Sequence, residues 1–244
     1  MISYAKNKNL IVNVITNGFW GKNEENAEKI IKNLKKNGLN ELSMSVDDFH
    51  QEFIEIKSIK NILKLCRKYK IKTSIGFGIT KQNYVGKYID YLNDLLINTK
   101  VVFYPIIPVG SANKNLNSEI YYDETKYDDK MMCPNNGIIS VLYDGNYYPC
   151  CSQIIKEGNL EIASIEDTTL SDAINLCMNN KFLFIMKIKG LRWIYDIIIE
   201  NNLKNFNEEK YYTTCDLCKN IFKDKELIEK LIPFIDKEIN EICK

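Results

Sequence analysis

Residues 10–46 read LIVNVITNGFWGKNEENAEKIIKNLKKNGLNELSMSV, and this stretch decides the fold class. Residues 10–16 form an apolar run of the kind found in buried parallel strands, and Asn17-Gly18 ends it. Residues 24–36 carry apolar side chains at helical spacing, namely Ala27, Ile30, Ile31 and Leu34. Residues 41–46 then form a second strand. The stretch therefore predicts a strand–helix–strand unit with two parallel strands.

The same alternation continues as far as residue 107. Further helices are predicted at 59–69 and 85–97, and further strands at 71–79 and 101–107. Repeated units of this length predict an α/β fold with a parallel sheet and right-handed crossovers. Ligands of such sheets bind at the carboxyl ends of the strands. In this chain those ends lie at residues 16–18, 45–48, 78–80 and 108–111.

The second half of the chain has a different organisation. Residues 111–130 are polar and rich in Asn, Asp and Tyr, and we interpret them as a linker. We accordingly expect one domain at 1–115 and a small α+β domain at 116–244. Residues 138–148 predict a hairpin that turns at Asp144-Gly145. Helices are predicted at 170–178, at 183–202 with an interruption near Gly190, and at 225–243 with a kink at Pro233.

Four of the eight cysteines have the spacing of a metal site. Cys133 and Cys150 bracket the predicted hairpin, and Cys215-Asp-Leu-Cys218 is a C-x-x-C motif. A C-x-x-C motif places two thiolates on one tight turn, so both can reach the same metal centre. Two more thiolates beside the hairpin complete a four-sulfur shell. Such a shell suits either zinc or an iron–sulfur cluster.

The other cysteines are interpreted differently. Cys151 adjoins Cys150, and neighbouring side chains of a strand face opposite sides, so we expect only one of the two to bind. Cys66 lies on the apolar face of a predicted helix and is interpreted as a core thiol. Cys177 and Cys243 lie in helical stretches, and either is an alternative ligand. A disulfide framework is the competing interpretation, but it is typical of short secreted chains.

Composition excludes several classes of function. The 244 residues include 33 Lys and Arg against 32 Asp and Glu, which gives a net charge of +1. This balance gives no reason to expect nucleic acid or an anionic membrane surface as a partner. No segment reaches the roughly 18 apolar residues of a membrane span, and the first residues lack the apolar centre of a signal peptide. We therefore expect a cytoplasmic location.

The order of these motifs resembles the auxiliary-cluster domain of radical S-adenosylmethionine enzymes (radical SAM enzymes), in its SPASM form and its shorter Twitch form. The matching segments are Cys133, Asp144-Gly-Asn-Tyr-Tyr-Pro-Cys150, Glu157-Gly-Asn-Leu160 and Cys215-Asp-Leu-Cys218. Upstream, residues 16–18, 45–47 and 106–112 resemble the ends of the third, fourth and sixth strands of that family's barrel. The resemblance covers nearly the whole chain. It implies a partial (β/α) barrel that lacks its first strands, followed by a small cluster-binding domain.

The resemblance also implies roles for individual residues. As in the Twitch form, one auxiliary [4Fe–4S] cluster would be bound by Cys133, Cys150, Cys215 and Cys218. Zinc is the alternative metal. S-adenosylmethionine would be contacted by Asn17, Gly18, Ser45, Asp47, Thr80 and Gly110. The competing interpretation is helix capping for Ser45, Asp47, Thr80 and the nearby Asn83. For Gly110 it is an ordinary loop glycine. His50 is the only histidine and is interpreted as a structural or surface residue, so catalytic residues stay unassigned.

One departure from the family limits the function that the resemblance implies. The family holds its catalytic cluster with a C-x-x-x-C-x-x-C motif, and S-adenosylmethionine binds the iron that those cysteines leave open. This sequence contains no such triplet. The resemblance therefore implies that this chain alone does not form a 5′-deoxyadenosyl radical. We expect either a fragment of a disrupted gene or one part of a split enzyme whose partner chain supplies the missing N-terminal half.

Three classes of function follow. Radical enzymes with such domains often modify peptides, so the resemblance implies a peptide substrate. The alternative is a non-enzymatic binding module, in which the metal stabilises the small domain and the open sheet docks a partner. A thiol oxidoreductase is the third class, but its C-x-x-C motif would be expected within the strand–helix region, and here the motif lies outside it.

Overall fold

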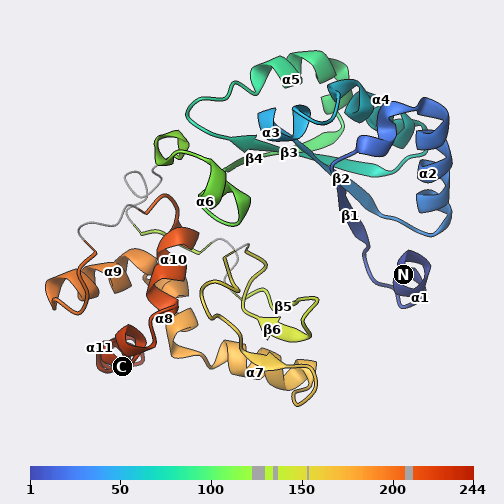
Figure 1. Cartoon of the computed structure of the whole chain (residues 1–244). Coiled ribbons are helices and arrows are strands. Elements are labelled where there is room, and N and C mark those ends of the chain that lie inside the picture. The colour runs from blue at the N-terminus through green and yellow to red at the C-terminus, as the bar shows by residue number, and fades with distance from the viewer. Residues whose placement is uncertain (123–129, 134–136, 153, 207–210) are drawn as a thin grey trace. The chain divides into compact units, whose positions relative to one another are not determined.

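The structure is a computed structural model of the chain, and it describes residues 1–122, 130–133, 137–152, 154–206 and 211–244. The chain divides into two compact units, Met1–Ile106 and Ile107–Lys244. In Figure 1 the first unit contains a sheet with helices, and the second unit is mainly helical.

Four parallel strands form the sheet of the first unit, and they lie in the sheet in their order along the chain. They are β1 (Asn13–Thr16), β2 (Glu41–Val46), β3 (Lys72–Ile79) and β4 (Thr99–Pro105). Helices alternate with these strands, so the predicted α/β fold with a parallel sheet is confirmed.

The helices cover one face of this sheet (Figure 1). The longer ones are α2 (Glu24–Lys36), α4 (Ile56–Lys68) and α5 (Gly86–Leu92). The short elements are α1 (Ile2–Asn7), η1 (Phe19–Lys22), α3 (Asp48–Gln51) and η2 (Asn93–Leu96). The sheet residues beneath the helices are apolar and at most 1% exposed, for example Leu42, Met44, Ile75 and Phe77. Burying each such side chain contributes about 1.5–3 kcal/mol, so this core holds the unit together.

On the opposite face, the two central strands β2 and β3 carry polar side chains and glycines, because alternate residues of a strand point to opposite sides. Ser43 of β2 and Ser74 of β3 lie side by side there, with their hydroxyl oxygens 2.6 Å apart. Closer to the carboxyl end, β3 places Gly76 and Gly78 on this face. A Cβ atom at Gly76 would lie 2.7 Å from the ring of Tyr104. The glycines therefore leave room over the backbone for the side chains of neighbouring strands.

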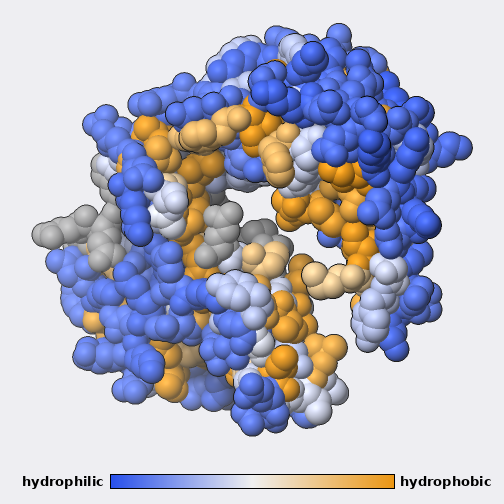
Figure 2. Space-filling model, turned by 45° about the vertical axis from the view of Figure 1, so that its right-hand side comes forward, coloured by the Kyte–Doolittle hydropathy of each residue, from blue (hydrophilic) through white to orange (hydrophobic). Residues whose placement is uncertain are grey.

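The edge strands β1 and β4 carry exposed apolar side chains. Ile15 of β1 is 78% exposed, and Phe103 of β4 is 50% exposed. Figure 2 shows that such apolar patches interrupt a surface that is otherwise mostly hydrophilic. An apolar edge strand with a free row of backbone groups is a site where another strand can pair.

The second unit contains a small antiparallel sheet. Its strands are β5 (Ser140–Val141), β6 (Asn146–Tyr148) and β7 (Ala163–Ser164), in that order. β5 and β6 form the predicted hairpin, and Gly145 has the positive φ, 78°, that its turn requires. β7 has no signal in the sequence, because two residues are too few for an alternating pattern.

In its described residues, the second unit also contains seven helical elements. They are α6 (Ser111–Asn115), η3 (Ser118–Ile120), α7 (Leu170–Met178), α8 (Lys181–Ile188), α9 (Leu191–Glu200), α10 (Thr214–Phe222) and α11 (Lys225–Ile242). α6 and η3 lie inside the segment interpreted as a linker, whose residues 123–129 are outside the described part. Pro233 lies within α11.

The interruption predicted near Gly190, within the helical stretch 183–202, is confirmed. Gly190, at φ 83°, separates α8 from α9. A Cβ atom at this position would lie 1.9 Å from the carbonyl oxygen of Lys130, so the close approach of two backbones excludes any larger residue. The chain therefore turns at Gly190 and forms two short helices.

No helix in the described ranges combines the length and the apolar character needed to cross a lipid bilayer. This agrees with the absence of a long apolar segment from the sequence.

Candidate functional site

The second unit brings four cysteines from three segments into one neighbourhood, which we call the four-cysteine site (Cys133, Cys150, Cys215 and Cys218). The evidence is electrostatic. The pKa of Cys150 is raised to about 11, mainly by burial and further by the negative charges of Cys133 and Cys215. Removal from solvent raises the pKa of Cys218 well above its ordinary value, and Cys215, Cys133 and Cys150 add to the effect. The four cysteines therefore lie within electrostatic reach of one another.

The C-x-x-C motif lies on the first turns of α10, whose start is well fixed. Thr213 is the N-cap residue, and its side-chain oxygen accepts a hydrogen bond from the backbone N–H of Asp216 at 3.1 Å. Asp216 lies between the two cysteines and is only 4% exposed. Its carboxylate accepts a hydrogen bond from the Tyr212 backbone N–H at 3.3 Å and pairs with Lys219 at 3.2 Å. These contacts hold the turn that presents the two thiols.

The loop after Cys150 packs against the same helix. A Cβ atom at Gly158 would lie 3.4 Å from the Cα atom of Lys219. The ammonium group of Lys219 also lies 3.8 Å from Glu157. A hydrogen bond from the backbone N–H of Ser152 to the sulfur of Cys150 lowers the pKa of that thiol, against the effect of burial. Such N–H donors are the partners that metal-bound thiolates use.

Four thiolates are a donor set that suits an iron–sulfur cluster or zinc. Within the described ranges, no three His, Cys, Asp or Glu side chains are grouped closely enough to hold a single metal ion. A tetrahedral zinc ion with Zn–S bonds of about 2.3 Å needs its sulfurs roughly 3.8 Å apart. The thiolates of a four-iron cluster bind different irons and therefore lie farther apart. By the chemistry of its thiolates, the donor set fits either group.

The other cysteines lie in different environments. Cys151 is exposed, although its charge reaches Cys150. Burial alone raises the pKa of Cys177, so no effect of another cysteine is seen there. Cys243 is exposed at the end of α11. Burial raises the pKa of Cys66 to about 12, which fits an inert core thiol.

The first unit has a second candidate site at the carboxyl ends of β2, β3 and β4, which we call the strand-end site (Ser45, Asp47, Thr80 and Tyr104). Asp47 is 1% exposed, and Thr80 is 2% exposed. The pKa of Tyr104 is raised mainly by burial. A hydrogen bond with Ser45 lowers this pKa, and the charge of Asp47 raises it further. Ser45, Asp47 and Tyr104 are therefore neighbours.

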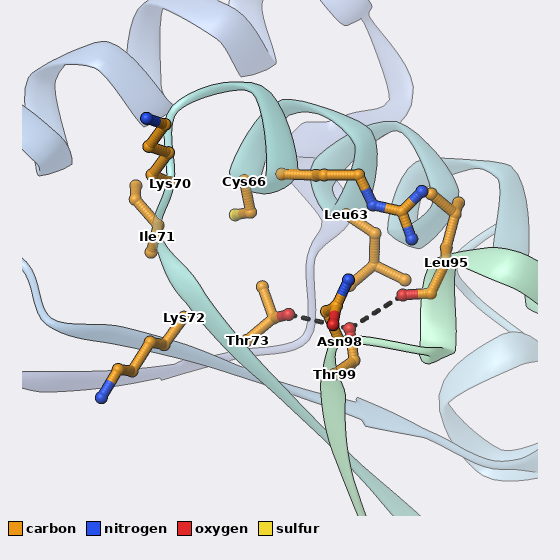
Figure 3. Close-up of a pocket in the computed structure, with 10 residues that line it drawn as sticks. Leu63, Cys66, Lys70, Ile71, Lys72, Thr73, Leu95, Asn98 and Thr99 are labelled. Carbon is orange, nitrogen blue, oxygen red and sulfur yellow. Dashed lines mark hydrogen bonds between the residues drawn. The ribbon is translucent and has the colours of Figure 1, made fainter.

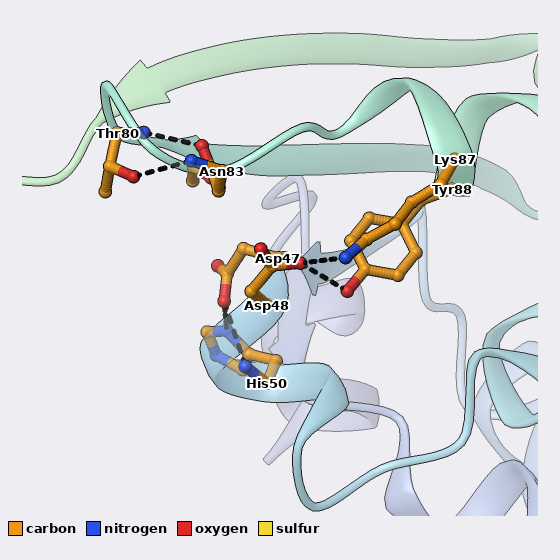
Figure 4. Close-up of polar contacts among 8 residues, drawn as sticks. Asp47, Asp48, His50, Thr80, Asn83, Lys87 and Tyr88 are labelled. Atoms are coloured by element: carbon orange, nitrogen blue, oxygen red, sulfur yellow. Dashed lines mark hydrogen bonds and ion pairs between the residues drawn. The ribbon is translucent and has the colours of Figure 1, made fainter.

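Asp47 has one satisfied and one unsatisfied oxygen. Its Oδ1 accepts a hydrogen bond from the His50 backbone N–H at 2.9 Å and lies 2.8 Å from Nδ1 of the His50 ring (Figure 4). Its Oδ2 is buried and has no hydrogen-bond partner in the described part of the chain. A Cβ atom at Gly78 would lie 2.7 Å from this oxygen. A buried carboxylate oxygen without a donor is costly, so it marks a place where a ligand or water can donate.

Thr80 and Asn83 form a compact turn at the end of β3 (Figure 4). The backbone N–H of Thr80 donates to Oδ1 of Asn83 at 2.7 Å, and the backbone N–H of Asn83 donates to Oγ1 of Thr80 at 3.1 Å. The amide of Asn83 also donates to the carbonyl of Gly78 at 2.7 Å. These partners are all internal, so the two residues shape the turn.

The remaining predicted contact residues have backbone roles. Asn17 accepts a hydrogen bond from the Phe19 N–H at 3.3 Å. Gly18 has a φ of 76°, and a Cβ atom there would lie 2.6 Å from the side chain of Ile59. Gly110 belongs to the second unit, where it precedes α6 with a φ of 55° and open space around it.

Sequence reasoning missed Tyr104 and the pairing of His50 with Asp47. A signal for Tyr104 was available: the Gly-Phe-Gly of residues 76–78 leaves one face of a strand bare, which indicates that side chains of the next strand fill that face. The pairing of His50 depends on the tight turn into α3, which sequence patterns do not specify.

A pocket of about 290 Å³ lies at the other end of the sheet, where β3 and β4 begin (Figure 3). Its polar groups are satisfied internally: the hydroxyls of Thr73 and Thr99 are 2.9 Å apart, and Thr99 donates to the Leu95 carbonyl. Arg67 is paired with Asp94 at 3.1 Å. The amino ends of strands mainly serve stability, so this pocket is not a candidate site.

Comparison with known proteins adds one relative. The chain is 28% identical over 238 residues to the putative peptide biosynthesis protein YydG of Bacillus subtilis. The alignment covers 96% of this chain and 74% of YydG. No family model matches the chain.

Proposed function

We propose that this chain holds one four-iron, four-sulfur cluster on its four-cysteine site and takes part in the radical modification of a peptide. The observation that carries the proposal is the gathering of four cysteines from three separate segments of the second unit. Buried thiolates repel one another, and a bound metal centre would remove that repulsion. When bound, such a cluster supplies electron transfer or helps to position a substrate.

The domain assignment is part of the same proposal. We assign the first unit to a partial barrel of the radical S-adenosylmethionine enzymes and the second unit to their Twitch-type domain. The order of the cysteine motifs and the parallel sheet support this assignment. The similarity to YydG, whose name describes peptide biosynthesis, supports a peptide as substrate.

S-adenosylmethionine is the cofactor that we assign to the strand-end site. The buried Asp47 oxygen without a donor supports a ligand there, since a bound molecule with hydroxyl or ammonium groups would satisfy it. The sequence lacks the cysteine triplet that binds the catalytic cluster, so the radical source would have to come from a complementing segment. The chain would supply strand ends and the auxiliary cluster.

The first test is the metal content after anaerobic reconstitution with iron and sulfide. The proposal predicts about four irons and four sulfides per chain. Stoichiometric zinc with no iron would overturn it and would favour a metal-stabilised binding module. A chain that takes up no metal would also contradict the proposal.

A second test concerns the radical. The reconstituted chain, mixed with S-adenosylmethionine and a strong reductant, should form no 5′-deoxyadenosine above the level of a protein-free control. Formation of that product would show that this chain needs no complementing segment. The auxiliary assignment of the cluster would then be wrong.

A further inference from the structure

Asp47 and His50 form a carboxylate–imidazole pair just beyond the carboxyl end of β2 (Figure 4). The carboxylate is almost fully buried, whereas the His50 side chain is 37% exposed. One nitrogen of the ring is therefore fixed by a buried group, and the ring remains accessible to a ligand. The four-cysteine site and its metal play no part in this arrangement.

The pair determines which ring nitrogen is free to accept a proton. A carboxylate can only accept hydrogen bonds, so the proton between Asp47 Oδ1 and His50 Nδ1 is carried by the nitrogen. The neutral ring then has its lone pair on Nε2. In the described part of the chain, no hydrogen bond to Nε2 is recorded. This nitrogen can therefore take a proton from outside the chain.

The carboxylate also favours the charged ring that results. The hydrogen bond with Asp47 is the largest effect on the pKa of His50 and raises it. Burial lowers this pKa, and the charge of Asp47 raises it further. Other charged groups nearby are already paired. Asp48 accepts a hydrogen bond from the Tyr88 hydroxyl at 2.6 Å and forms an ion pair with Lys87 at 2.7 Å. Tyr104 approaches the pair from β4, on the side of Asp47.

The pair also lies where parallel sheets bind ligands. It follows the end of β2, and the unsatisfied Oδ2 of Asp47 lies against Gly78 at the end of β3. A ligand that donates to this buried oxygen would be held beside the His50 ring. The same carboxylate group would then bind the ligand with one oxygen and orient the base with the other.

We infer that His50, oriented by Asp47, is the proton acceptor for a hydroxyl or ammonium group of a ligand bound at the strand-end site. In this step the O–H or N–H bond of the ligand breaks, and a new bond forms between the hydrogen and Nε2. The electron pair stays on the ligand oxygen or nitrogen, and Asp47 stabilises the imidazolium. The step needs no oxidant or reductant, and Asp47 acts as the positioning residue.

His50 is the only histidine in the chain, so one imidazole signal can be followed without assignment. Nitrogen NMR of the full chain would show which ring nitrogen carries the proton in the neutral form. The inference predicts a proton on Nδ1. A proton on Nε2 would overturn it, because that nitrogen would then have no lone pair to accept another.

The second measurement is the pH profile of the reaction between His50 and diethyl pyrocarbonate, which modifies the neutral ring. Asp47→Asn should move the midpoint down by about one pH unit. Asp48→Asn is the matched control, since Asp48 is the adjacent carboxylate and contacts Lys87 and Tyr88 instead. Equal midpoints in the two variants would overturn the inference. If Asp47→Asn fails to fold, the NMR result on the unmodified chain decides.

Discussion

The two units of this chain are stabilised in different ways. The first unit packs helices against long parallel strands and buries one continuous apolar core. In the second unit the helices share such a core, but the hairpin region buries only Tyr148, Cys150 and Ile155 as a cluster of its own. Apolar packing therefore stabilises the first unit, and we expect the hairpin of the second unit to depend on the four-cysteine site as well.

The largest effect is expected from removing one of the four cysteines. Cys218→Ser should lower the iron content after reconstitution below about four per chain, because the iron that Cys218 would bind loses its protein ligand. Iron analysis and the visible absorption of the cluster measure this. Cys243→Ser is the control, since Cys243 is exposed at the end of α11. If Cys218→Ser retains the full iron content, Cys218 is not a ligand.

Removal of the metal should lower the local stability of the second unit and leave that of the first unit unchanged. In the metal-free chain, backbone amides at 140–148 should exchange hydrogen about tenfold faster or more, which corresponds to about 1.4 kcal/mol of lost local stability. Amides of β2 and β3 should exchange at an unchanged rate, since their core does not involve the cysteines. Hydrogen-exchange mass spectrometry of the loaded and metal-free chains measures both. An equal change of the exchange rates in the two units would contradict the claim that only the second unit depends on the metal.

A smaller effect concerns the edge of the first unit. Ile15 lies on the edge strand β1, so the chain should self-associate through this strand, and Ile15→Lys should reduce the association. Ile97→Lys is a matched control, because Ile97 is also 78% exposed but lies outside the strands. Light scattering at several protein concentrations measures the mass. If the unmodified chain is monomeric at every concentration, β1 does not mediate self-association.

The smallest effect is on the acid stability of the first unit. Hydrogen bonds from Lys68 and Tyr69 lower the pKa of Glu28 from an ordinary 4.5 to about 2. Because the folded pKa is depressed, this stabilisation is present above pH 4.5 and is lost as the pH falls toward about 2. Glu28→Gln should therefore flatten the loss of stability in this window, whereas Glu24→Gln should not. Denaturant unfolding between the two pH values measures the slopes, and equal slopes would contradict the assignment.

The sequence specified the first unit more completely than the second. Apolar periodicity predicted the bounds of α2 and β2 correctly, because each pattern extends over a whole element. In the second unit the sequence indicated the interruption near Gly190, but not the approach of Lys130, which is about 60 residues away, because no local pattern contains that contact. β7 is held by its pairing with β6 and has no pattern of its own.

The candidate sites show the same division. The cysteine spacing predicts four metal ligands from residue type and order, and in the structure the charges of neighbouring cysteines act on the pKa values of Cys150 and Cys218. Their role as ligands stays a prediction. At the strand ends, the pattern indicated the carboxyl edge of the sheet but not the environment of each residue. Thr80 and Asn83 form hydrogen bonds with each other. That Oδ2 of Asp47 has no hydrogen-bond donor follows only from the three-dimensional structure of the turn that holds His50.

Mössbauer spectroscopy of the iron-loaded chain, recorded with and without S-adenosylmethionine, tests the central claim most directly. A cluster held by four cysteines has a protein ligand on every iron, so the spectrum should show one four-iron cluster and should not change when S-adenosylmethionine is added. A spectrum in which one iron becomes distinct on addition would contradict the account, because that iron would lack a cysteine ligand.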